Sequence, residues 1–290
     1  MIEFQEVERS YGEKLAVRRL NLRIVPGELF SLLGHNGAGK TTTIKMLVGL
    51  LQPGAGRVRV CGHDLATRPR EATQTIGYVP DQPYLYDKLS GREFLRFVGE
   101  MHGLEPQAVE EAVQREAERF GLGPFMDELT ESYSHGMKQR TVFASALLHS
   151  PRVLVVDEPM VGLDPQSIRL VKDLLRREAN AGMCVLMSTH TLSAAEEISD
   201  RIGVMSRGDL IFEGTVEELK SHGEGTSDSL EATYLKLMED PPTADEANGS
   251  AGEWHSQERH TSEEGSESPV ATGDIDGDSD GDETPSANAG

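Results

Sequence analysis

The stretch GELFSLLGHNGAGKTTTIKMLVGLL, residues 27–51, decides the fold. Its first part, GELFSLLG, is short and apolar and predicts a buried strand, while its last part, KTTTIKMLVGLL, predicts a helix. Between them GHNGAGKT, residues 34–41, fits the pattern G-x-x-x-x-G-K-[ST]. That pattern carries meaning between a strand and a helix, and here it has both neighbours. The stretch therefore predicts a phosphate-binding loop on an α/β core.

The residue types in this loop suit a polyphosphate. Glycines let consecutive backbone N–H groups face one concavity, and the helix N-terminus adds the positive end of its dipole. We expect Lys40 to reach the β- and γ-phosphates and the Thr41 hydroxyl to bind Mg²⁺. The alternative is a glycine-rich turn without a ligand, which the flanking strand and helix disfavour. The guanine-reading sequence Asn-Lys-x-Asp does not occur in the chain, so ATP is the expected nucleotide.

Hydrophobic patterning around this stretch predicts alternating strands and helices. Residues 1–25 alternate as an antiparallel strand pair that turns at Tyr11 and Gly12, and 56–65 return to strand alternation. From about Lys88 to Ser150 apolar residues recur at helical spacing. Further on, the predicted order is a buried strand, a helix, a buried strand, a helix and a closing hairpin, over 152–159, 167–182, 183–190, 192–200 and 201–214.

These elements predict an α/β protein with a P-loop NTPase core and a mostly parallel sheet. An N-terminal antiparallel β subdomain precedes that core, and a helical subdomain over about 87–150 is inserted into it. The ATP-binding domain is expected to span 1–220, followed by a helical extension over 221–240.

Residues 241–290 are predicted to form a disordered acidic tail. They hold 13 acidic residues, one arginine and many glycines, serines and prolines. Such a segment cannot bury enough apolar surface to offset the entropy lost on ordering. From Asp276 the sequence DGDSDG fits the front half of a calcium loop, but Ala287 stands where the bidentate glutamate is needed.

The overall charge and hydropathy limit the partners. With 28 Lys and Arg against 49 Asp and Glu, the formal charge of −21 disfavours nucleic-acid binding, which relies on cations. With 8 Lys and 20 Arg, the composition resembles that of proteins from salt-adapted organisms. We find neither a signal peptide nor an apolar run of about 18 residues. A cytoplasmic protein that reaches a membrane through a partner is expected.

Two predicted strand ends carry further polar groups. VLVVDEP ends with Asp157 and Glu158, and CVLMSTH ends with His190. Open α/β sheets bind ligands at the carboxyl ends of their strands. We expect Asp157 to hold Mg²⁺ through water, Glu158 to orient or deprotonate the attacking water, and His190 to contact the γ-phosphate. A solvated acidic loop and a structural histidine are the alternatives.

Together these residues resemble the ATP-binding subunit of an ABC transporter over about residues 1–220. Tyr11 matches the aromatic residue that stacks on adenine, Asp164 in GLDP matches the D-loop carboxylate, and His190 matches the switch histidine. VLVVDEP matches the strand that holds magnesium and the catalytic glutamate after it. The resemblance implies that the nucleotide contacts Gly34, His35, Asn36, Gly37, Ala38, Gly39, Lys40, Thr41 and Thr42.

SYSHGMKQR, residues 132–140, resembles the signature motif of the same family, usually Leu-Ser-Gly-Gly-Gln. Ser134 and Gly136 are retained, whereas His135 and Met137 replace the commoner Gly and Gln. The resemblance implies that this segment starts a helix facing the nucleotide of a second subunit. Ser is a good N-cap, and its hydroxyl and the free N–H groups can bind phosphate oxygens. In a lone monomer the segment would be a simple helix cap.

The Q-loop of the family normally has Gln after GYVP, and here the sequence reads GYVPDQP. Asp81 stands at the Gln position and Gln82 follows it, so the metal- and water-sensing role is open between them. Both this departure and the signature variant are similar to those of single-domain subunits from ABC-2-type, multidrug-exporter-like systems.

The resemblance implies two partners, an integral membrane permease and a second ATP-binding subunit in a homo- or heterodimer. The permease would dock near Asp81–Tyr86, and the protein would sit on the inner face of the cell membrane. Export is favoured over import because sugar importers often extend into a folded regulatory domain. Two alternatives are an ABC-type ATPase in membrane signalling or mechanotransmission, and a soluble ATPase acting in translation or on DNA.

Overall fold

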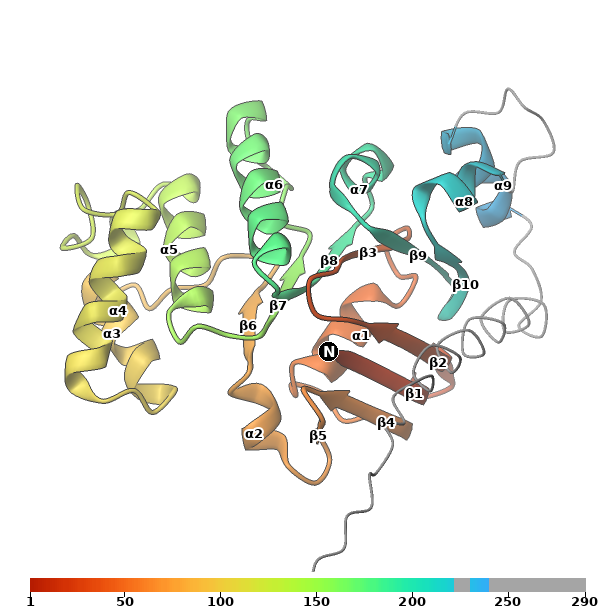
Figure 1. The fold of residues 1–290 in the computed structure, drawn as a ribbon, viewed down its shortest axis with the longest axis horizontal. Coiled ribbons are helices and arrows are strands. Elements are labelled where there is room, and N and C mark those ends of the chain that lie inside the picture. Colours follow the sequence, from red (N-terminus) through yellow and green to blue (C-terminus); the bar gives the residue numbers. More distant parts are fainter. Residues whose placement is uncertain (222–229, 240–290) are drawn as a thin grey trace, which may run out of the picture. The chain divides into compact units, whose positions relative to one another are not determined.

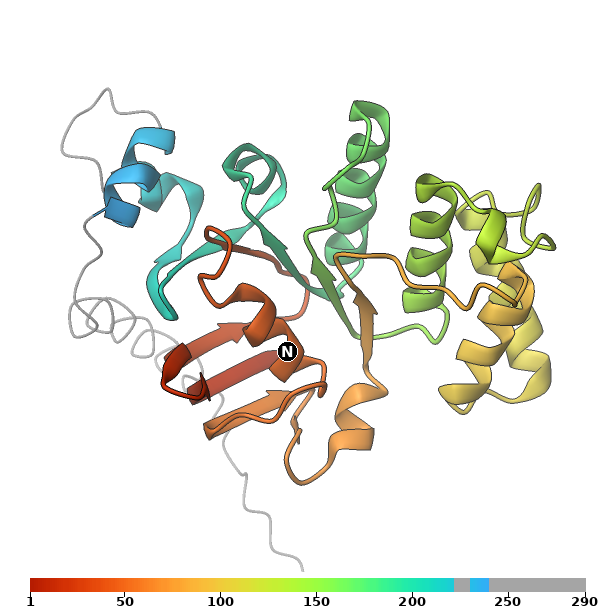
Figure 2. The same ribbon diagram turned by 180° about the vertical axis from the view of Figure 1, so that it is seen from behind.

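The computed structural model describes residues 1–221 and 230–239 (Figures 1 and 2). The acidic tail predicted for 241–290, and part of the predicted extension over 221–240, lie outside the described residues. Within the described part of the chain, no helix is both long and apolar enough to cross a bilayer.

A six-stranded sheet forms the core, as predicted. Its order is β10-β9-β3-β8-β7-β6, and all neighbouring pairs are parallel except the closing pair β9–β10. Every residue of β3, β7 and β8 is buried, which explains their continuous apolar sequences. The strands are β3 (Leu29–Leu33), β6 (Ile76–Val79), β7 (Val153–Asp157), β8 (Cys184–Thr189), β9 (Arg201–Ser206) and β10 (Asp209–Gly214).

A second, antiparallel sheet contains the N-terminus. The predicted pair β1 (Ile2–Tyr11) and β2 (Lys14–Ile24) is confirmed. The other edge of β1 pairs with β4 (Ala55–Val60), which in turn pairs with β5 (His63–Asp64), giving the order β2-β1-β4-β5. The two sheets share a core through α1 (Lys40–Leu47), because β1, β2, β4 and α1 bury side chains against one face of β3, β7 and β8.

Helices cover the other face of the main sheet. Along β7, Val153 and Val155 pack toward α1, whereas Leu154 and Val156 pack toward the helices, as strand alternation requires. Besides α1, the helices outside the inserted subdomain are α2 (Pro69–Thr73), whose Ala72 packs on the α1 side, and α6 (Pro165–Asn180), α7 (Leu192–Ile198), α8 (Val216–Ser221) and α9 (Leu230–Glu239).

The inserted helices lie between β6 and β7 in sequence. They are α3 (Gly91–Met101), α4 (Pro106–Arg119) and α5 (His135–Leu147), with a 3-10 turn at Thr130–Ser132. Figures 1 and 2 show them together beyond the β6 edge of the sheet. Ser90 starts α3 with a reciprocal capping box to Glu93. Arg119 of α4 contacts Glu178 of α6 and so joins this group to the core.

Three expectations need correction. The helix predicted over 40–51 ends at Leu47, because Gly49 takes a left-handed backbone with φ of 77°. The helical pattern over 88–150 is interrupted between Arg119 and His135. Strand β6 and helix α2 were not predicted, because each is no more than five residues long and shows too few repeats of any period.

Candidate functional site

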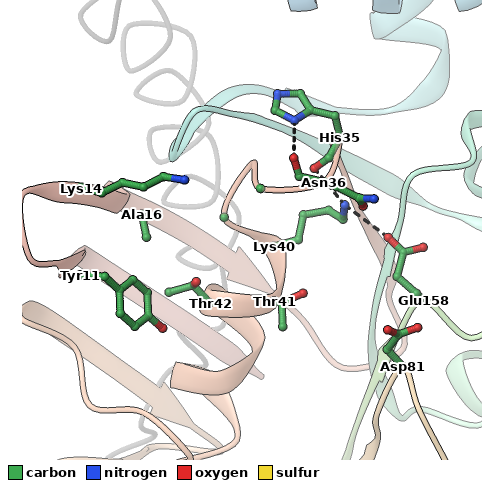
Figure 3. A pocket seen from close by; sticks show the side chains of 12 residues that line it. Tyr11, Lys14, Ala16, His35, Asn36, Lys40, Thr41, Thr42, Asp81 and Glu158 are labelled. Atoms are coloured by element: carbon green, nitrogen blue, oxygen red, sulfur yellow. Dashed lines mark hydrogen bonds and ion pairs between the residues drawn. The ribbon is translucent and has the colours of Figure 1, made fainter.

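A cleft opens where the carboxyl end of the main sheet faces the β1–β2 turn (Figure 3). The phosphate loop after β3 forms one wall, and the hairpin forms another. Ten of the predicted site residues line the cleft, and Lys14 and Ala16 line it without having been predicted. The lining residues are Tyr11, Lys14, Ala16, His35, Asn36, Gly37, Gly39, Lys40, Thr41, Thr42, Asp81 and Glu158.

The loop between β3 and α1 is held by close backbone packing. A Cβ atom on Gly34 would lie 2.5 Å from the Met205 carbonyl oxygen, and one on Gly39 would lie 2.6 Å from that of Ala16. Both glycines have positive φ, 155° and 117°. The Gly208 amide also donates to the Ala38 carbonyl at 2.8 Å. The loop is therefore fixed between β2 and the β9–β10 turn before any ligand binds.

The N-terminus of α1 collects positive charge at the floor of the cleft. Gly39 is its N-cap residue and no side chain caps the helix, so the first amides are left for another acceptor. The Lys40 side chain is only 5% exposed. Its Nζ donates to the carbonyl of Gly34 at 2.6 Å and lies 3.4 Å from that of His35. An amide cradle with a held cation is an anion site.

Glu158 faces this lysine from the end of β7. Its Oε1 lies 3.3 Å from Lys40 Nζ as an ion pair, yet this buried oxygen has no hydrogen-bond partner among the described residues. The other oxygen, Oε2, lies 2.9 Å from His190 Nδ1 and accepts from the His190 amide at 3.3 Å. The backbone of Glu158 is left-handed, with φ of 49°, and its amide donates to Ser188 Oγ at 3.1 Å. The strand end thus turns Glu158 into the cleft while His190 holds one carboxylate oxygen.

Asp157 lies directly before Glu158 and is buried, with 2% of its surface exposed. The Ser188 hydroxyl of the neighbouring strand donates to its carboxylate. Burial raises the pKa of Asp157, the carboxylates of Asp81 and Glu158 raise it further, and the Ser188 hydrogen bond and Lys40 oppose the rise. Burial, Asp157 and Asp81 also raise the pKa of Tyr78 to about 12. These carboxylates therefore share one region of negative potential beside the phosphate loop.

The oxygen groups of this region fit a Mg²⁺ ion. Thr41 and Asp81 line the cleft, the Asp157 carboxylate lies beside it, and Glu158 contributes the buried oxygen without a hydrogen bond. Mg²⁺ prefers such hard oxygen ligands and is usually held by one or two carboxylates together with phosphates and waters. Among the described residues, no group of three or more His, Cys, Asp or Glu could hold a metal ion. Gln82 is exposed and does not line the cleft.

Ser134, Gly136 and Asp164 do not line the cleft. Ser134 is exposed and caps α5, accepting from the Met137 amide at 3.3 Å, and Gly136 has open space where a Cβ would stand. Asp164 caps α6, accepting from the amides of Gln166 and Ser167 at 2.9 and 3.0 Å. The Ser167 hydroxyl and these amides lower the pKa of Asp164.

The functional residues that the sequence did not indicate are Lys14, Ala16 and Ser188. Lys14 follows Tyr11 across the hairpin turn, and Figure 3 shows its side chain extending over the cleft. Ser188 connects Asp157 to the Glu158 amide because β8 pairs with β7 at this register. Only the pairing of strands that are distant in sequence reveals this role.

Known proteins are similar to this chain in sequence. A family model described as ABC transporter matches residues 17–161. YbhF of Escherichia coli, named a probable multidrug ABC transporter ATP-binding protein, is 36% identical over 243 residues, which are 83% of this chain and 42% of YbhF. Nod factor export ATP-binding protein I of Burkholderia lata is 40% identical over 218 residues, 75% of this chain and 72% of that protein. The linearmycin resistance ATP-binding protein LnrL of Bacillus subtilis is 36% identical over 221 residues, 76% and 71% of the two chains. The chain therefore spans less than half of YbhF but most of the other two.

Solved structures share the fold. The ATP-binding subunit of an ABC transporter superposes with a TM-score of 0.76 and 29% identity, covering 82% of this chain and 99% of that one. A bacterial ABC transporter cassette solved as a dimer superposes with a TM-score of 0.68 and 26% identity, covering 74% and 98%. Nearly the whole of both solved chains is matched.

Proposed function

The chain belongs to the ABC transporter family, and from this premise we propose that it is the ATP-hydrolysing subunit of a membrane exporter. The observation that carries the proposal is the meeting of Lys40, Glu158 and His190 beside the phosphate loop. A phosphate-binding lysine and a carboxylate that can position water serve hydrolysis of a terminal phosphate, and His190 holds that carboxylate in place.

The loop amides and Lys40 bind the phosphates of ATP, and the ring of Tyr11 stacks on adenine. Thr41, Asp157 and Asp81 hold Mg²⁺, which when bound neutralises charge on the phosphate oxygens. Asp81 takes the Q-loop position in preference to Gln82, because Asp81 alone of the two lines the cleft. Lys14 adds a second cation over the phosphates.

Glu158 orients the attacking water and accepts its proton while the water oxygen bonds to the γ-phosphorus and ADP leaves. Its Oε1 suits this role because it is buried and has no hydrogen-bond partner among the described residues. His190 fixes Oε2 and contacts the γ-phosphate. General base catalysis of this kind contributes about 10² to 10⁴ in rate.

A second subunit completes the cleft over the γ-phosphate. Ser134, Gly136 and Asp164 are exposed residues at the starts of α5 and α6 that do not line the cleft of their own chain, so we assign them to the nucleotide of a partner subunit. The dimeric state of a related cassette supports this assembly. ATP drives closure because it contacts both halves, and hydrolysis reopens them.

A permease binds at the inserted helices. Tyr84 and Tyr86, which follow Asp81 in the sequence, and Phe97 of α3 are exposed large apolar side chains, and the Tyr86 ring makes edge contacts with those of Tyr84 and Phe97 at 5.9 and 5.6 Å. An exposed apolar patch of this kind marks a protein interface. A subunit bound to a permease in this way would lie on the cytoplasmic face of a membrane, and the names of the relatives favour export.

Glu158→Gln tests the function. The variant should bind ATP as before, lose about 100-fold or more in turnover, and elute as an ATP-bound dimer in size-exclusion chromatography. Glu231→Gln, on the exposed side of α9, is the matched control and should hydrolyse normally. Hydrolysis by Glu158→Gln at the wild-type rate would remove Glu158 as the base.

A further inference from the structure

The guanidinium of Arg9 lies behind the cleft residue Tyr11. Both side chains belong to β1 and are two positions apart, so they project from the same face of the strand. The Arg9 Cζ atom lies over the Tyr11 ring, 5.4 Å from its centroid. This separation is within the range in which a cation is attracted to an aromatic face.

Arg9 is held in this place by backbone rather than by a carboxylate. Its Nη1 donates to the carbonyl of Gln52 at 3.1 Å, in the segment that joins α1 to β4. The same segment is fastened to β1 where the Gly54 amide donates to the Glu8 carbonyl at 2.7 Å. Arg9 Nε is buried without a hydrogen-bond partner, and no carboxylate of the described ranges forms an ion pair with Arg9. The positive charge therefore faces a backbone carbonyl and an aromatic ring rather than a carboxylate.

The guanidinium of Arg9 covers one face of the Tyr11 ring. Tyr11 is 49% exposed and lines the cleft, while the guanidinium occupies one side of its ring. A flat ligand in the cleft would therefore stack on the opposite side. Stacking against a ring whose orientation is already fixed avoids the entropy of ordering it upon binding.

We propose that Arg9 is a positioning residue for the base of the nucleotide, forming a three-layer stack of guanidinium, tyrosine ring and purine. The inference rests on the proposed function, in which Tyr11 stacks on adenine. The cation draws electron density toward the covered face, so the open face favours the larger, electron-rich purine over a pyrimidine. Arginine suits the role better than lysine because its guanidinium can face the ring with one part and donate to the Gln52 carbonyl with another.

The experiment compares equilibrium binding of ATP, CTP and inorganic tripolyphosphate to the wild type, Arg9→Gln and Arg9→Lys. Arg9→Gln should bind ATP about two- to fivefold more weakly than the wild type, which is the loss expected on removing an exposed cation–π contact. Its affinity for CTP should fall less than its affinity for ATP. Tripolyphosphate has no base, so its affinity should not change. Arg9→Lys should fall between. Arg57→Gln, an exposed arginine of the same sheet outside the cleft, is the matched control.

A double-variant cycle separates this inference from its premise. In Tyr11→Ala the further change Arg9→Gln should have no effect on ATP binding, because the ring through which it acts is gone. An equal loss for tripolyphosphate, or a loss that persists without the ring, would overturn the positioning role. If Tyr11→Ala itself leaves ATP affinity unchanged, the adenine contact fails. If Tyr11→Ala weakens binding and Arg9→Gln does not, the Arg9 inference alone fails.

Discussion

Helices α1 and α5 begin in contrasting surroundings. At α1 no side chain caps the helix, the cation Lys40 is buried, and strands β2 and β9 enclose the loop before it. At α5 the hydroxyl of Ser134 caps the helix, and the first residues are exposed. One helix start is enclosed within its own chain, and the other is open to solvent.

The difference shows that a helix N-terminus becomes a complete binding site only through its surroundings. Both ends carry free amides and a dipole. The α1 end carries its own Lys40 and gains the Glu158 carboxylate and the Tyr11 ring from elements distant in sequence. Among the described residues the α5 end gains no comparable group, and in the proposed function a second chain completes it.

Lys40→Ala should produce the largest effect because it removes the charge at the enclosed end. It also leaves the Glu158 carboxylate without its cation, which should lower the free energy of unfolding by about 3 kcal/mol or more. We expect ATP affinity, measured by calorimetry, to fall by about two orders of magnitude. Lys45→Ala, exposed in the last turn of the same helix, should bind ATP normally.

Ser134→Ala should lower turnover by about 10- to 100-fold, the value of a hydrogen bond to a charged group, without weakening ATP binding to the monomer. Ser134→Asp separates the two roles of this residue. Asp caps helices as well as Ser, so α5 should remain stable, but its charge would repel a partner's phosphate. Normal turnover by Ser134→Asp would mean that the α5 end acts only as a cap.

Asp157→Asn should raise the melting temperature of the protein without nucleotide by a small amount. Burial raises the folded pKa above its unfolded value, so the ionised carboxylate lowers stability at neutral pH, and this penalty disappears as pH falls through the folded pKa. Thermal unfolding at pH 7 should show the gain, and the difference from wild type should shrink toward acid pH. Asp173→Asn, exposed on α6, should show no gain.

Asp164→Asn should have the smallest effect at neutral pH, because Asn and Asp are equivalent N-caps. The folded pKa of Asp164 is lowered, so its charge stabilises the fold above the unfolded value of 3.8 and loses this contribution as pH falls below it. The free energy of unfolding, measured with urea between pH 6 and 3, should therefore decline more steeply for the wild type than for the variant. If the two proteins lose stability in parallel as the pH falls, the charge of Asp164 does not contribute to the stability of the fold.

Much of the fold followed from local pattern. The β3–loop–α1 unit was predictable because its glycines, lysine and threonine are consecutive, and β7 and β8 because their apolar runs are continuous. The pairing of β4 with β1 was not predictable, because nothing in the sequence GRVRV indicates which strand it pairs with. Likewise Ala16 approaches Gly39, and Ser188 reaches Asp157, only after distant strands come together.

The candidate site likewise contains residues that could be identified from the sequence and residues that could not. Lys40, Asp157 and Glu158 were identifiable because strand ends at one sheet edge must meet. Lys14 was not, because a lysine in a hairpin turn is an ordinary surface residue by sequence. The orientation of Asp81 into the cleft, with Gln82 outside it, depends on the exposed loop after β6 and not on residue type.

The ion pair between Lys40 and Glu158 couples nucleotide binding to the release of the Glu158 carboxylate. In the chain by itself, each charge is neutralised by the other. In the proposed function an arriving triphosphate competes with this carboxylate for Lys40, so nucleotide binding and the release of Glu158 to act as the base occur together. Without nucleotide, the ion pair would keep the Glu158 carboxylate engaged with Lys40.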